Sequence, residues 1–149
     1  MRNQDKWVET NTFHYHNQNP RNRITEDCVA RAISAALEQD YNQTIIEMVQ
    51  MQVKTGYAFN GPKGIDKYLQ SKGFVKYKQP RKDDNTKYTG EEWCNKISKD
   101  KSFLNKNIVA NIGGHHSVCI KPHEGRYKVW DIWNSTEGCI GNYWVKCSD

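Results

Sequence analysis

The chain has 149 residues and a net charge of +5 at pH 7, and 36% of its residues are hydrophobic. This length suits one domain with a single hydrophobic core. Its five Trp, eight Tyr and four Phe exclude an intrinsically disordered chain, and no apolar stretch approaches the roughly 20 residues that a membrane helix requires. No apolar segment follows the N-terminal charges, so we predict no secretory signal and no membrane partner, and we expect an intracellular protein.

The first part of the chain predicts a polar segment followed by helices. Residues 1–24 are rich in asparagine and predict an extended lead-in to one domain over residues 25–149. Apolar residues then recur at helical spacing, and glycines mark the helix ends. Residues 61–64 predict a loop, as do residues 78–89. Helices are expected at residues 25–38, 42–54 and 65–71, and from residue 89 through Ile97.

After residue 107 the pattern changes to short apolar runs that are bounded by turns. Strands are expected at residues 108–112, 116–120, 126–132 and 143–145. Helices followed by strands predict an α+β fold, with the N-terminal helices packed on one face of a C-terminal antiparallel sheet.

Cys28 lies in the first turn of the first predicted helix, after Thr25, Glu26 and Asp27. A thiol there faces unpaired backbone N–H groups and the positive end of the helix dipole. This environment favours the thiolate, which is the nucleophilic form of cysteine.

The predicted strands supply a base and a carboxylate for this thiol. Residues 122–125, with proline first and glycine last, predict a four-residue hairpin loop that pairs Lys121 with Arg126. His116 then lies directly opposite Asp131 on one face of the sheet, close enough for a hydrogen bond. Cys28, His116 and Asp131 thus have the chemical types of a nucleophile, a general base and an orienting group.

Three further residues are candidates for supporting or alternative roles. Asn22, six residues before Cys28, is the candidate side-chain donor to an oxyanion, beside the backbone N–H of Cys28. His115 is the alternative base, although the predicted pairing turns it to the other face. Asn134 is the alternative to Asp131 as the orienting residue.

Two windows of the chain, residues 27–33 and 114–133, carry a resemblance to a known family. Asp27-Cys28-Val29-x-Arg31-Ala32-Ile33, followed by Gly114-x-His116-x-Val118-x-Ile120 and Trp130-Asp131-x-Trp133, resembles the papain-like cysteine peptidase superfamily. The chain looks most like the small single-domain members that bacteriophages and mobile elements encode. The resemblance implies cleavage of a peptide, isopeptide or related amide bond in a protein or peptide substrate, without a metal or other cofactor. The glutamine that usually serves the oxyanion in this family is missing near Cys28, since Gln18 is ten residues away.

Two other functions remain open from the sequence. The scaffold could serve as a non-catalytic interaction or inhibitor protein, because a fold does not fix a function. Zinc binding is a weaker alternative, because the ligand types are present but their spacing matches no recurrent zinc motif. The residues that could bind zinc are His115, His116, Cys119, His123, Cys139 and Cys147. The positive charges are scattered and accompany no binding motif, so no nucleic-acid partner is predicted.

Overall fold

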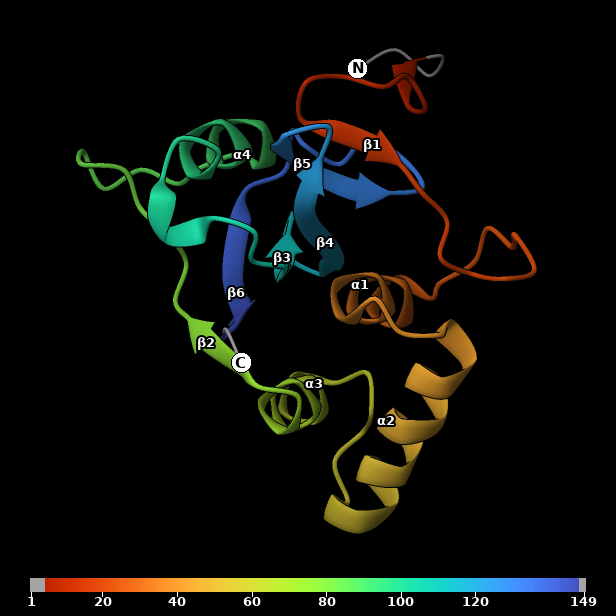
Figure 1. Cartoon of the computed structure of the whole chain (residues 1–149). Coiled ribbons are helices and arrows are strands. Elements are labelled where there is room, and N and C mark those ends of the chain that lie inside the picture. Colours follow the sequence, from red (N-terminus) through yellow and green to blue (C-terminus); the bar gives the residue numbers. More distant parts are fainter. Residues whose placement is uncertain (1–4, 148–149) are drawn as a thin grey trace.

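Four α-helices and one mixed six-stranded sheet make up residues 5–147, the part of the chain that the computed structural model describes (Figure 1). The predicted α+β class is therefore confirmed. The helices are α1 (Cys28–Leu37), α2 (Tyr41–Thr55), α3 (Pro62–Ser71) and α4 (Gly90–Ile97). The strands are β1 (Phe13–Tyr15), β2 (Phe74–Tyr77), β3 (Ile108–Ile112), β4 (His116–His123), β5 (Arg126–Asp131) and β6 (Ile140–Lys146).

Two strands of the sheet come from outside the predicted C-terminal set. The strand order is β1-β5-β4-β3-β6-β2, and β1 runs parallel to β5. The prediction of a purely antiparallel C-terminal sheet is therefore wrong. Part of the polar lead-in forms the first strand, and the segment after α3 forms β2 at the opposite edge. Strands of three and four residues are too short for alternation to mark them in a sequence.

The helices contact both faces of the sheet, and not one face as predicted. Val109 of β3 belongs to a core cluster with residues of α1, α2 and α3, whereas Ile108 and Ala110 belong to a second cluster with Trp93 and Ile97 of α4. Successive residues of a strand point to opposite faces, so the two clusters lie on opposite sides of the sheet.

Local sequence signals explain where several helices begin. At the start of α4 the Thr89 hydroxyl accepts from the Glu92 N–H, and the Glu92 carboxylate accepts from the Thr89 N–H, which completes a capping box. Pro62 occupies the first turn of α3, so the predicted loop at residues 61–64 is the start of that helix.

The hairpin between β4 and β5 differs in register from the predicted one. His123 pairs with Arg126, so Glu124 and Gly125 alone form the turn, both with positive φ. Relative to the predicted pairing the strands are shifted by two residues. A shift of two preserves the face of every side chain, whereas a shift of one would invert it. His116 and Asp131 therefore still share a face.

No helix within residues 5–147 has both the length and the apolar character needed to cross a bilayer.

Candidate active site

The N-terminus of α1 presents Cys28 together with free backbone donors. Cys28 is the first helical residue, and the preceding Asp27 makes no side-chain capping bond. The first intrahelical bond runs from the Arg31 N–H to the Asp27 carbonyl. Within the described residues, the N–H groups of Cys28, Val29 and Ala30 therefore have no protein acceptor. Such a helix end attracts negative charge, both the thiolate and any oxyanion that forms beside it.

The pKa of the Cys28 thiol is lowered, chiefly by hydrogen bonding with the His116 side chain. Burial of Cys28 opposes the shift. A hydrogen bond from the Ser117 backbone and the positive charge of Arg31 add to the lowering. Cys28 is therefore a thiol whose surroundings favour the thiolate, as its place in the first helical turn predicts.

His116 begins β4 and connects Cys28 to Asp131. Its Nε2 lies 2.6 Å from Oδ2 of Asp131, which leaves Nδ1 for the thiol. Burial disfavours the charged imidazolium, but the hydrogen bonds with Asp131 and Cys28 outweigh burial and raise the pKa of His116 to about 9. At neutral pH these shifts favour a thiolate beside an imidazolium.

The carboxylate of Asp131 is buried, with 1% of its surface exposed, and each of its oxygens accepts two hydrogen bonds. Oδ2 accepts from His116 and from the Ser135 hydroxyl at 2.8 Å. Oδ1 accepts from Arg31 Nη1 at 3.0 Å and from the Ile132 N–H at 2.8 Å. Four donors in fixed directions hold the carboxylate, which in turn holds the imidazole in one orientation.

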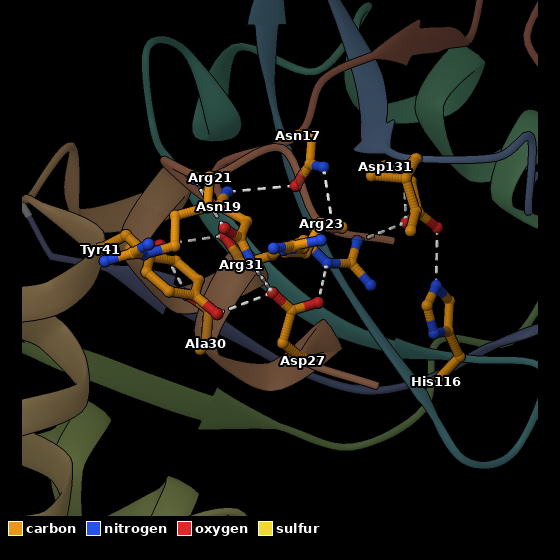
Figure 2. Close-up of polar contacts among 12 residues, drawn as sticks. Asn17, Asn19, Arg21, Arg23, Asp27, Ala30, Arg31, Tyr41, His116 and Asp131 are labelled. Atoms are coloured by element: carbon orange, nitrogen blue, oxygen red, sulfur yellow. Dashed lines mark hydrogen bonds and ion pairs between the residues drawn. The ribbon is translucent and has the colours of Figure 1, made fainter. Parts of the chain in front are cut away.

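Arg31 joins the helix N-terminus to the Asp131 carboxylate. Figure 2 shows its guanidinium between Asp27 and Asp131, with Nε 2.7 Å from Oδ1 of Asp27. The other oxygen of Asp27 accepts from Tyr41 at 2.7 Å and from Asn19 at 3.1 Å. Burial would raise the pKa of Asp27, but these three donors lower it. Asp27 is thus occupied as a partner of Arg31, which is why it does not cap the helix.

The network of Asp27, Arg31 and Tyr41 was not predicted from the sequence. Asp27 and Arg31 stand four residues apart, the spacing of an ordinary ion pair on a helix surface. No sequence signal indicated that the pair is buried or that Asp131 completes it.

The structure gives the other candidate residues different surroundings. Asn22 lies in an exposed turn with a φ of 54°, and within residues 5–147 its side chain makes no hydrogen bond with Cys28. Its role as an oxyanion donor stays a prediction. The Asn134 side chain accepts from the N–H and hydroxyl of Thr136 inside a buried turn, so Asp131, not Asn134, contacts His116. His115 is exposed.

Two cavities flank the Cys28–His116 pair, and His115 contributes to both. One, of about 460 Å³, lies on the His116 side and includes Trp133, whose ring centroid is 5.4 Å from that of His116. The other, of about 330 Å³, lies on the Cys28 side and includes Tyr41 and Phe59. The pair therefore stands between two hollows, an arrangement that suits an extended substrate with groups on both sides of the reacting bond.

The predicted zinc ligands do not form a site together. Cys119 is fully buried in the core, where burial raises its thiol pKa to about 12, and His116 is bonded to Asp131. Among the described residues, the group whose ligand atoms lie close enough to hold a metal is Glu9, His14 and His123. Of these, only His123 belongs to the predicted set. Its ring stacks on that of His14 with centroids 3.8 Å apart, and the Glu9 carboxylate is already paired with Lys128.

Comparison of the sequence with models of known protein families gives no match, and neither the curated proteins nor the solved structures contain a match to this chain.

Proposed function

We propose that this protein is a papain-like thiol hydrolase that cleaves a peptide, isopeptide or related amide bond. Cys28 is the nucleophile, His116 the general base and acid, and Asp131 the residue that orients His116. The observation that carries the proposal is the 2.6 Å contact between His116 Nε2 and the buried Asp131 carboxylate, together with the lowering of the Cys28 thiol pKa by the same imidazole. A cysteine that opens a helix, opposite a histidine that opens a strand, also supports the resemblance to the papain-like enzymes.

The residues suffice for acyl transfer with water as the only co-substrate. The Cys28 thiolate attacks the carbonyl carbon, and the oxygen that becomes negative faces the free N–H groups at the start of α1. His116 then gives its proton to the leaving nitrogen as the C–N bond breaks, which leaves a thioester on Cys28. His116 next takes a proton from water, the hydroxide attacks the thioester, and the carboxylic acid and the thiolate are released.

An activity-based probe tests the proposal directly. A peptidyl electrophile that reacts with thiol hydrolases should modify Cys28, and mass spectrometry should map the label to that residue. Iodoacetamide should label Cys28 with a pH midpoint clearly below the value of about 8.5 for a free cysteine. The exposed Cys139 and Cys147 serve as internal controls. An ordinary midpoint at Cys28 would remove the case for an activated nucleophile.

The chemistry also suggests where the protein acts. All five cysteines are free thiols, so we infer that the protein acts in a reducing, intracellular environment.

An observation on α2 supports a second candidate function, that of a non-catalytic interaction protein. An apolar stripe on this helix consists of Ile46, Val49 and Val53. The exposed fractions of these residues are 51%, 41% and 82%, in that order. Exposed apolar surface of this kind often marks a binding site for another protein. A Cys28→Ala variant separates the two functions in the biological assay. Unchanged activity of this variant supports an interaction protein, whereas lost activity with a retained fold supports hydrolysis.

A further inference from the structure

We propose that the cavity on the Cys28 side of the site is a subsite for a cationic side chain of the substrate, a lysine or an arginine, with Glu26 as its counter-ion. This inference rests on the proposed hydrolase function and specifies the class of substrate that the enzyme prefers.

The walls of this cavity suit a long aliphatic chain. The cavity measures about 330 Å³ and adjoins Cys28 itself. Tyr41 and Ile45 of α2 line it, together with Phe59 from the loop that follows α2. Lysine and arginine bury their methylene stems against such surfaces while the charged head stays near water. The cavity therefore has room and apolar contacts for the stem.

The charges around the cavity favour a substrate side chain with a positively charged end. Two carboxylates line it, and no lysine or arginine of the described residues does. Asp27 is already bonded to Arg31, Tyr41 and Asn19. Glu26 is exposed and has no ion-pair partner within residues 5–147. An entering cation would therefore find Glu26 available, whereas an anion would be repelled.

The cavity on the His116 side offers no such preference. Its lining carries the carboxylate of Glu137 against two cations, Lys6 and the imidazolium of His116. A preference for a cationic side chain is therefore expected on the Cys28 side alone.

A set of peptidyl electrophiles tests the subsite. In each probe a lysine, a norleucine or a glutamate occupies one of the four positions next to the electrophile, and the second-order rate of Cys28 modification is measured. In at least one position we expect lysine to react fastest and glutamate slowest. Norleucine matches the stem without the charge, so the ratio of the lysine rate to the norleucine rate isolates the contribution of Glu26.

Variants of Glu26 then assign the effect to this residue. Glu26→Gln should lower the lysine-to-norleucine ratio about two- to fivefold, the range for an exposed ion pair. Glu26→Lys should lower it about tenfold and make glutamate faster than lysine. Glu91→Lys is the matched control, because Glu91 is also an exposed glutamate at the start of a helix and its replacement changes the net charge equally. This control should leave the ratio unchanged.

The outcomes separate the subsite from the hydrolase function. If norleucine reacts as fast as lysine in every position while Cys28 is still modified selectively, the subsite is overturned and the hydrolase stands. If the Glu26 variants leave the ratio unchanged, the assignment of Glu26 is overturned. If no probe modifies Cys28 and iodoacetamide labels it with an ordinary pH midpoint, the hydrolase function fails, and the subsite with it.

Discussion

The substitution Asp131→Asn tests the part of the site that sets the charge of His116. Asparagine keeps the volume of the side chain and one acceptor oxygen, but it removes the negative charge. Its oxygen can still accept from Arg31 and Ile132, and its NH₂ group then faces the His116 Nε2. A donor at that point makes Nε2 an acceptor, so the proton of a neutral imidazole moves to Nδ1. His116 could then no longer take the proton of the Cys28 thiol.

The structure gives the size of this effect. The pKa of His116 is raised from 6.5 to about 9, which corresponds to about 3 kcal/mol in favour of the imidazolium. Of the two bonds that raise it, the one with Asp131 contributes more than the one with Cys28. Removal of the charge therefore removes at least half of this free energy. The population of the thiolate–imidazolium pair at pH 7 should fall by roughly tenfold to a hundredfold.

The assay is the rate of iodoacetamide labelling of Cys28 between pH 5 and pH 10, with each label located by mass spectrometry. We expect the labelling midpoint of Asp131→Asn to move toward that of an ordinary thiol, and the rate at pH 7 to fall in proportion. Asn134→Ala is the control, since Asn134 bonds to Thr136 and not to His116. An unchanged midpoint in Asp131→Asn, with urea unfolding that shows a folded protein, would refute the role of Asp131.

Three other outcomes are expected. Arg31→Met leaves the buried carboxylate of Asp131 and the partly buried one of Asp27 without their cation, so it should destabilise the protein by about 3 kcal/mol in urea unfolding. It should also shift the Cys28 labelling midpoint upward, because the charge of Arg31 lowers that pKa. A Cys28→Ser protein should lose stability as the pH rises above about 6.5, because Asp131 still holds the folded pKa of His116 above its unfolded value. The loss should be smaller than the full shift of about 3 kcal/mol, since the contribution of Cys28 is gone, and it should be absent when His116→Gln is added. Cys94 and Cys119 are fully buried, and burial raises the pKa of each thiol to about 12. Both should resist iodoacetamide in the native protein and react in 8 M urea. Labelling of either in the native protein as fast as that of Cys28 would contradict their placement in the core.

The sequence was enough to predict that His116 and Asp131 lie on the same face of the sheet, although the predicted strand register was wrong. Alternation along β4 and β5 places His116 with Val118 and Ile120, and Asp131 with Val129. The structure puts these apolar residues in one core cluster. The turn was predicted two residues too long, but an even error leaves every side chain on its face. The face on which a side chain lies follows from alternation within its own strand. The pairing register between two strands depends on the turn that joins them.

The exposed stripe on α2 shows where helical periodicity fails as a guide to burial. The apolar residues that recur at helical spacing in this helix include Met48, which is buried, but also Ile46, Val49 and Val53, which are exposed, whereas the polar Thr44 is buried. Spacing identifies residues on one side of a helix. Only the positions of neighbouring elements decide whether that side is covered.

Local sequence patterns were enough to predict the order of the helices and of most strands, and the three residues whose chemistry could form a catalytic site. Periodicity and helix-start signals are carried by residues close together in the chain, so they can be read without coordinates. Three features follow from the folded arrangement alone: Arg31 is buried between Asp27 and Asp131, β1 joins the sheet beside β5, and the first turn of α1 keeps its N–H groups free. The first two join segments 100 or more residues apart in the chain, and the third depends on Asp27 being held by Arg31. Local sequence patterns carry no information about such contacts.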